Sequence, residues 1–306
     1  MNIKTAMKML KKRDARVTLL NAAGAYRWMP DKMFLHFFYQ AKMGKKLNLE
    51  DPKTYNEKLQ WMKLYDHNPA YPLLVDKYEA KLIVAKKAGE QYIVPLIGVY
   101  DRLEQVDFAK LPNAFVLKTT HNSGGVYICP EKEKGVYIKK NGKRLTFAEM
   151  QQDVAKQLKS NHFAGSREWA YKEVKPRIII EEYIGNQVDD YKVMCFQGEP
   201  RIVYLESGRL GTVTCDFFDT DFNHLDIRQL NPNANKAYEK PIFLEEMLAV
   251  AKKLSADFPQ VRVDFFRSGD RLYFAELTFY NWGGFAKFEP EKWDEILGSY
   301  FTLPNK

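Results

Sequence analysis

Residues 261–284 read V-R-V-D-F-F-R-S-G-D-R-L-Y-F-A-E-L-T-F-Y-N-W-G-G. Aliphatic and aromatic residues alternate on both sides of the turn 268–270, which predicts a β-hairpin. Asp264 and Glu276 then fall on paired strands. Two carboxylates in an apolar sheet need a neutralising cation, and Mg²⁺ accepts such ligands. The arginines of the hairpin can neutralise them too, so the hairpin alone leaves metal binding and salt bridging equally open.

Length and amino-acid composition indicate the class of protein. The 306 residues, 45% hydrophobic and 14% aromatic, predict a globular chain of two domains or one large composite domain. Cys129, Cys195 and Cys215 are widely spaced, which favours neither a zinc site nor a disulfide framework. No run approaches the roughly 18 apolar residues of a membrane span. We expect a cytoplasmic protein.

The formal charge of +8 favours anionic partners such as nucleotides, acidic glycans or lipid headgroups. The sequence lacks zinc-finger spacing and a dense basic helix, so nucleic acid is not an expected partner. Near the N-terminus, Ile3, Ala6, Met7 and Leu10 recur at helical spacing among lysines. This pattern predicts a solvated basic helix, with weak contact to the inner face of the cytoplasmic membrane as the alternative.

Sequence patterns predict mixed helices and strands. Residues 30–71 favour packed helices, and further helices are expected at 76–89, 145–158 and 244–258. The helix at 145 begins with a capping box of Thr146 and Glu149. Strands are expected at 96–100, 114–118, 126–129, 177–185, in a hairpin over 188–206 that turns at 197–200, and from 212 to 219.

A small polar loop follows the strand that ends at Lys118. Residues 119–125, T-T-H-N-S-G-G, combine glycine with Ser123 and Asn122, so backbone N–H groups can turn toward a phosphate. Lys118 would add a positive charge there. The alternative is an ordinary hairpin turn, since the stretch lacks the P-loop pattern and no helix follows it.

The order of these motifs resembles the ATP-grasp superfamily. More specifically, it resembles the TupA-like (teichuronopeptide biosynthesis) ATP-grasp family of bacterial surface-polysaccharide clusters. The resemblance covers the chain from about residue 30 onward. Its matching motifs are N-E-K-L-Q-W-M-K-L-Y at 56–65, D-K-Y at 76–78, F-V-L-K-T-T-H-N-S-G-G at 115–125, E-E-Y-I at 181–184, D-Y-K at 190–192, V-R-V-D-F at 261–265 and F-A-E-L-T-F-Y-N-W-G-G at 274–284.

The resemblance implies an α+β ATP-grasp fold, in which two subdomains clamp ATP, preceded by a helical region. We expect an N-terminal helical region at 1–72, a phosphate-loop subdomain at 73–184 and a metal-binding subdomain at 185–306. Lys118 would hold the α- and β-phosphates, Asp190 the ribose and Lys192 the γ-phosphate. The implied nucleotide-binding set is Lys118, Asn122, Ser123, Gly124, Gly125, Glu181, Glu182, Tyr183, Ile184, Asp190 and Lys192.

The resemblance also implies that Asp264 and Glu276 hold one or two Mg²⁺ ions between the β- and γ-phosphates, which favours the metal interpretation of the hairpin. Superfamily members commonly have asparagine two residues after the second acid, whereas this chain has Thr278. A hydroxyl is a poorer ligand than an amide carbonyl. The third ligand is therefore Thr278, a water molecule or Asn281.

For most ATP-grasp enzymes the reaction is ligation of a carboxylate to an amine through an acyl phosphate. The resemblance thus implies a ligase that joins an amine or amino acid to a uronic acid or acidic peptide in surface-polysaccharide synthesis. Lys192 and Arg262 are the catalytic candidates, and Arg201, Arg209 and Asn281 the substrate candidates. The arginines can equally form structural ion pairs. The alternatives are a kinase of a sugar or glycolipid hydroxyl and a nucleotide-sugar glycosyltransferase.

Overall fold

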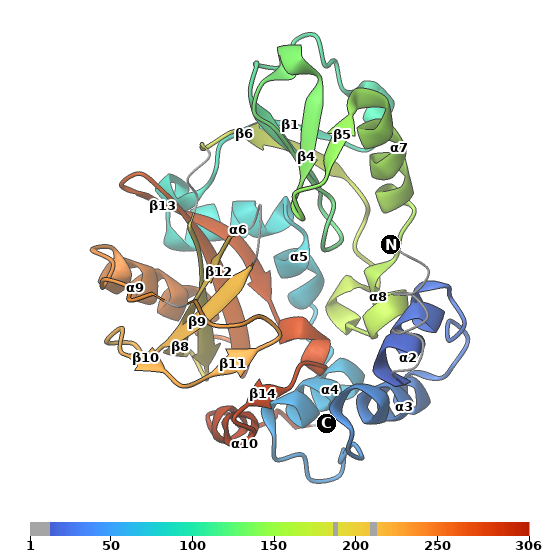
Figure 1. Cartoon of the computed structure of the whole chain (residues 1–306), viewed down its shortest axis with the longest axis vertical. Helices are drawn as coiled ribbons and strands as arrows, with labels where there is room; N and C mark the ends of the chain where they lie inside the picture. The colour runs from blue at the N-terminus through green and yellow to red at the C-terminus, as the bar shows by residue number, and fades with distance from the viewer. Residues whose placement is uncertain (1–12, 186–188, 209–212, 235, 306) are drawn as a thin grey trace.

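The computed structural model describes residues 13–185, 189–208, 213–234 and 236–305. Two antiparallel sheets dominate these residues, one built before residue 185 and one after it. Figure 1 shows the first sheet at the top of the molecule and the second below it. The predicted basic helix with Ile3, Ala6, Met7 and Leu10 lies outside the described residues, and so does Arg209.

The first sheet has the strand order β1-β6-β2-β3-β4-β5. Phe115 and the helix α7 (Phe147–Leu158) contribute to its core, with Met150 fully buried. The predicted capping box is confirmed, because Thr146 and Glu149 each bond the other's backbone N–H at the start of α7. The strands are β1 (Leu96–Tyr100), β2 (Phe115–Thr119), β3 (Val126–Cys129), β4 (Val136–Lys139), β5 (Arg144–Thr146) and β6 (Ile178–Glu182).

The second sheet has the strand order β10-β9-β8-β7-β12-β13. It contains the predicted hairpin, in which Asp264 pairs with Glu276 and Arg262 with Thr278. The helix α9 (Leu244–Ser255) packs on β7, β8 and β12 through its apolar face. The strands are β7 (Asp189–Phe196), β8 (Glu199–Ser207), β9 (Thr214–Phe218), β10 (His224–Leu225), β12 (Gln260–Ser268) and β13 (Arg271–Thr278).

Helix α4 (Tyr55–Tyr65) carries the first motif of the chain and ties the N-terminal helices to the turn after β13. Gln60 and Lys63 lie three residues apart, on one face of the helix. The Gln60 amide donates to the carbonyl of Gly284 at 2.7 Å, and the Lys63 ammonium donates to the carbonyl of Gly283 at 2.6 Å. Both side chains are buried, so this face of α4 does not contact solvent. Their hydrogen bonds hold the helix against the turn after β13.

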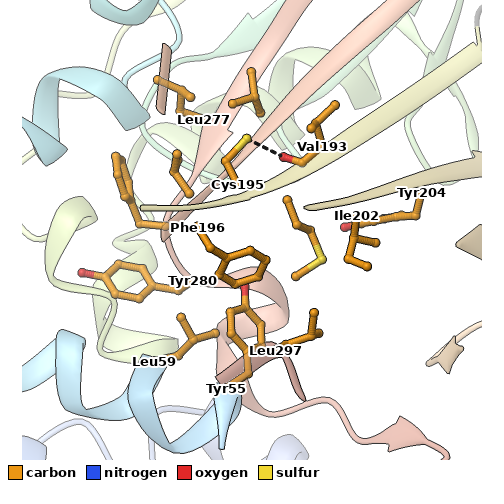
Figure 2. Packing of buried hydrophobic residues seen from close by; sticks show 14 of the residues in the cluster. Tyr55, Leu59, Val193, Cys195, Phe196, Ile202, Tyr204, Leu277, Tyr280 and Leu297 are labelled. Carbon is orange, nitrogen blue, oxygen red and sulfur yellow. Dashed lines mark hydrogen bonds between the residues drawn. The ribbon is translucent and has the colours of Figure 1, made fainter. Parts of the chain in front are cut away.

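Aromatic side chains join α4 to the second sheet and to the C-terminal helix α10 (Lys292–Ser299). Figure 2 shows Tyr55 and Leu59 packing near Phe196 and Leu297. The rings of Tyr55 and Phe196 meet edge to face, with centroids 5.8 Å apart. The remaining elements are α2 (Arg13–Ala22), α3 (Asp31–Met43), α5 (Tyr71–Val75), α6 (Glu79–Ala88), α8 (His162–Ser166), the short 3₁₀ helices η1 (Glu90–Tyr92), η2 (Leu103–Gln105), η3 (Lys132–Lys134), η4 (Trp169–Tyr171) and η5 (Asn281–Gly284), and the strand pair β11 (Arg228–Gln229) and β14 (Phe288–Glu289).

Helix α6 belongs by packing to the second sheet. It contacts α9 and β13, and its Val84 is fully buried in the same apolar cluster as Phe196. The predicted subdomain boundary near residue 73 stays a prediction. Among the described residues, the helices are all too short or too polar to cross a membrane.

Candidate active site

A cavity of about 720 Å³ lies between the two sheets. Residues of β2, β3, β4 and β6 line it from the first sheet, and residues of β7, β8, β12 and β13 from the second. This volume is within the usual range for a small-molecule site. The predicted residues that line it are Lys118, Glu181, Glu182, Tyr183, Ile184, Asp190, Lys192, Asp264 and Glu276.

The two sheets give the cavity walls of different character. On the first sheet, Val116, Ile128 and Ile138 stand in register on β2, β3 and β4 and form an apolar stripe. On the second, Lys192, Asp264 and Glu276 stand in register on β7, β12 and β13 and form a charged row. The cavity therefore suits a ligand with a flat apolar part and an anionic part.

Lys118 is held in place by a buried acid. Its ammonium lies 2.5 Å from Glu181, whose other oxygen lies 2.8 Å from Lys81. Burial favours the neutral acid, but Lys118 and Lys81 outweigh it and lower the pKa of Glu181. Glu181 is thus a fixed anion that orients Lys118, with its side chain unavailable to pair with a nucleobase.

The polar loop 119–125 is anchored through Asn122. Its side-chain oxygen accepts a hydrogen bond from Thr119 at 2.6 Å, and its amide donates to the side chains of Gln157 and Ser160 at the end of α7. A Cβ on Gly125 would clash with the Thr119 hydroxyl, so a larger residue here would force Thr119 or the loop to shift. The predicted residues Asn122, Ser123, Gly124 and Gly125 do not line the cavity in the described structure.

Lys192 is surrounded by carboxylates. Its ammonium lies 2.7 Å from Asp190, 3.1 Å from Asp264 and 3.4 Å from Glu206. Burial disfavours the ammonium, but these acids outweigh it and raise the pKa of Lys192 above its ordinary value. Lys192 therefore remains charged across the physiological pH range.

Asp264 forms a two-pronged ion pair with Arg262. Arg262 Nε lies 2.6 Å from Oδ1 of Asp264, and Nη2 lies 2.7 Å from Oδ2. The same guanidinium donates from Nη2 to Thr278 at 3.0 Å and from Nη1 to Asn281 at 2.7 Å and Tyr204 at 2.9 Å. For Asp264, the salt-bridge interpretation of the hairpin is thus the one seen in the structure.

Glu276 has a different environment from its partner on β12. Its side chain is 34% exposed and its only ion pair in the described structure is a long one, 3.4 Å to Arg262. Burial favours the neutral acid, but Lys140, Lys77 and Arg262 outweigh it and lower the pKa of Glu276 to about 2. An ionised carboxylate that faces the cavity fits a hard cation such as Mg²⁺, with Asp264 beside it.

Among the described residues, no group of three or more His, Cys, Asp or Glu side chains could hold a metal ion. The protein alone therefore supplies only part of a coordination shell. Mg²⁺ usually completes such a shell with water and substrate phosphate. This donor set fits a cation that is carried in with a phosphorylated ligand.

Four other predicted residues, the catalytic candidate Arg262 among them, lie off the cavity lining. Thr278 and Asn281 accept hydrogen bonds from Arg262, and Asn281 is fully buried with its oxygen also bonded by Tyr204. Arg201 lies on β8 with its guanidinium over the ring of Tyr300 at 5.7 Å. The structure does not bring Arg201 to the lining of the cavity.

The structure adds cavity residues to which the sequence interpretation gave no role. Lys77, from the D-K-Y motif, donates to the backbone carbonyl of Asn122 at 2.5 Å and lines the cavity. Its place in a matched motif was the available signal. Lys140, Lys236 and Glu206 also line the cavity, but they come from turns and from β8, where the sequence offered no motif.

Comparisons with known proteins show the relationships of the chain. The D-alanine–D-alanine ligase of Bacillus anthracis complexed with ATP is 16% identical, with 68% of this chain and 55% of the ligase covered and a TM-score of 0.40. The same ligase from Helicobacter pylori is 18% identical, with 82% and 69% covered and a TM-score of 0.38. The N5-carboxyaminoimidazole ribonucleotide synthetase of Thermus thermophilus is 12% identical, with 74% and 52% covered and a TM-score of 0.39.

This chain thus spans little more than half of the first of these ligases. Curated protein sequences give no significant match. A family model described as TupA-like ATPgrasp matches residues 57–302, which takes in both sheets and every helix from α5 onward. The chain therefore belongs to the TupA-like ATP-grasp family, with an α+β ATP-grasp fold preceded by N-terminal helices.

Proposed function

We propose that this chain is an ATP-dependent ligase that joins a carboxylate to an amine through an acyl phosphate. The observation that carries the proposal is the cavity between the sheets, with an apolar stripe on one wall and a charged row on the other. Membership in an ATP-grasp family supports ATP as the ligand. The fit of an apolar ring and a polyanion to these walls supports the same choice.

The nucleotide would lie with its base against Val116 and Ile128 and its phosphates toward Lys118. The segment from Glu182 to Ile184, which leaves β6 at the cavity, would offer backbone groups to the edge of the adenine ring. Lys118, fixed by Glu181, would hold the α- and β-phosphates. Asp190 is fully buried against Lys192, so we assign it the support of that lysine and not direct contact with the ribose.

Mg²⁺ would be held by Glu276, with Asp264 adjacent. When bound, it would neutralise charge on the β- and γ-phosphates. Lys192 would stabilise the γ-phosphoryl group from the side of the second sheet. Lys77 and Lys140, which line the cavity and lower the pKa of Glu276, would add positive charge near the phosphates. Arg262 would act indirectly, by holding the Asp264 carboxylate in position.

The reaction would have two steps. A carboxylate oxygen of the acceptor attacks the γ-phosphorus, the bond to the β-phosphate oxygen breaks, and ADP leaves with the acyl phosphate in place. The amine nitrogen then attacks the acyl carbon, phosphate leaves, and the amine loses a proton. Such chemistry needs cations around the phosphates and a site that keeps water from the acyl phosphate.

For the acceptor we propose a uronic acid or acidic peptide of a surface polysaccharide, amidated by an amino acid or amine. The excess of basic residues, +8 formally, supports an acidic acceptor. Lys236 and Lys140 are exposed at the cavity and supply positive charge where an acceptor would approach. Since ATP is the donor, we place the reaction in the cytoplasm, at most at the inner membrane face.

Product analysis tests this proposal. The protein is incubated with Mg²⁺, ATP and pooled amines, amino acids and uronic-acid glycans, with hydroxylamine present to trap an acyl phosphate. ADP together with a hydroxamate is the expected result. ADP with a stable phosphate ester would show a kinase instead, and release of UDP from a pool of sugar nucleotides would show a glycosyltransferase.

A further inference from the structure

All the donors of Arg262 are used inside the protein. A guanidinium carries five N–H groups. Arg262 donates to both oxygens of Asp264, to Thr278, to Asn281 and to Tyr204, at 2.6 to 3.0 Å. Five acceptors therefore match five donors, in a residue that is 7% exposed. Arg262 has to break one of these bonds before it can contact a substrate.

The acceptors around Arg262 are in turn committed to it. Both oxygens of Asp264 accept from Arg262, and one of them also lies 3.1 Å from the Lys192 ammonium. The oxygens of Thr278 and Asn281 point to the same guanidinium. A divalent cation bound by any of these three side chains would lie next to the positive charge of the buried guanidinium, and this repulsion disfavours it there.

Glu276 is the exception in this cluster. It faces the cavity and touches Arg262 only through the long contact of 3.4 Å. The cluster as a whole contains the carboxylates of Asp190, Glu206, Asp264 and Glu276 and the cations of Lys192 and Arg262. Asp190 and Asp264 are already paired with these two cations, and Lys77 and Lys140 add positive charge near Glu276. A second divalent cation would add positive charge to a site whose buried acids are already paired.

We propose that Arg262 is the permanent second cation of this site, so that one divalent cation, and not two, binds with the nucleotide. Glu276 is the carboxylate that coordinates it, and Tyr204, Thr278 and Asn281 are positioning residues that keep Arg262 against Asp264. This inference rests on the proposed function, because the phosphates of ATP supply ligands that the described residues lack.

The test counts Mn²⁺ ions, which substitute for Mg²⁺ and give an electron paramagnetic resonance signal when free. The protein and a non-hydrolysable ATP analogue are mixed in equal amounts, well above their dissociation constant, and titrated with Mn²⁺. We expect binding to saturate at one Mn²⁺ per complex. Two bound Mn²⁺ ions would overturn the inference and leave ATP binding untouched. Failure of the analogue to bind would overturn the proposed function and, with it, this inference.

Two variants test whether Arg262 limits the number of Mn²⁺ ions that bind. Arg262→Gln removes the fixed positive charge and frees Asp264, so the folded variant is expected to take up a second Mn²⁺. Arg267→Gln is the matched control, because Arg267 also lines the cavity but pairs with Asp189, and its count should stay at one. A folded Arg262→Gln protein that still binds one ion would contradict the role given to Arg262. The number of Mn²⁺ ions bound by the unmodified chain tests the inference without any variant.

Discussion

Asp264 and Glu276 pair across β12 and β13, yet their surroundings give them different tasks. Asp264 is 1% exposed and neutralises Arg262 and Lys192 within the protein. Glu276 is the partly exposed acid whose charge is directed to the cavity. The salt-bridge interpretation of the hairpin therefore fits Asp264, and the metal-site interpretation fits Glu276.

Substitution of each acid by its amide should separate these tasks. Asp264→Asn leaves two buried cations without their shared carboxylate and should lower the free energy of unfolding by about 3–5 kcal/mol. Glu276→Gln should lower it by less than Asp264→Asn does, since the side chain of Glu276 is partly exposed and its ion pair among the described residues is long. It should nevertheless lower kcat/KM at least about 100-fold. Urea denaturation and steady-state kinetics measure both, and equal stability losses in the two variants would argue against this division.

The loop 119–125 shows how one element is shaped by a close approach of the chain to itself. Gly125→Ala would place a methyl group on the Thr119 hydroxyl and should destabilise the protein by about 1–3 kcal/mol. Gly165→Ala in α8 is the matched control, because a Cβ there meets no atom within 4 Å and the change should be neutral or slightly stabilising. Chemical denaturation of both variants makes the comparison. An unaffected Gly125→Ala protein would mean that the loop is not closed as described.

The buried Lys63 on α4 makes stability depend on pH. Burial lowers its pKa to about 7, while Glu168 opposes the shift. Between this value and the ordinary pKa of 10.5, the unfolded chain binds a proton that the folded chain does not, so stability rises with pH. From about pH 7.5 to 8.5 the contribution is about 1.4 kcal/mol.

Lys63→Met removes this titration. The variant should show a smaller increase in unfolding free energy between about pH 7.5 and 8.5, measured by urea denaturation at each pH. Lys110→Met, at a side chain 85% exposed, is the control and should keep the original slope. If Lys63→Met also kept it, Lys63 would not be the titrating group.

Sequence patterns were sufficient where structure depends on neighbours along the chain. The β12–β13 hairpin and the capping box of α7 follow from periodicity and local hydrogen bonding. The direct pairing of Asp264 with Glu276 does not, because it depends on a register shift between Asp264 and Phe265. The partners of Arg262 could not be found in this way. Tyr204 and Asn281 lie 58 and 19 residues from it and meet it only once the sheet is formed and η5 has folded back.

At the scale of the whole molecule, motif order predicted the family and the fold class. It also predicted nine of the residues that line the cavity, with members from both sheets. It did not predict that Glu181 is an internal anion shared by Lys81 and Lys118, because residues 100 and 63 positions apart come together only in the tertiary structure. The division into three regions, with boundaries near residues 73 and 185, stays a prediction.

The proposed function depends on the cavity between the two sheets being a nucleotide site. Isothermal titration calorimetry of the full chain with a non-hydrolysable ATP analogue and Mg²⁺ tests this claim most directly. We predict one analogue per chain and at least about tenfold weaker binding to Lys118→Met, with unchanged binding to Lys110→Met. A chain that binds no ATP analogue, or that binds it equally well without Lys118, would contradict the account.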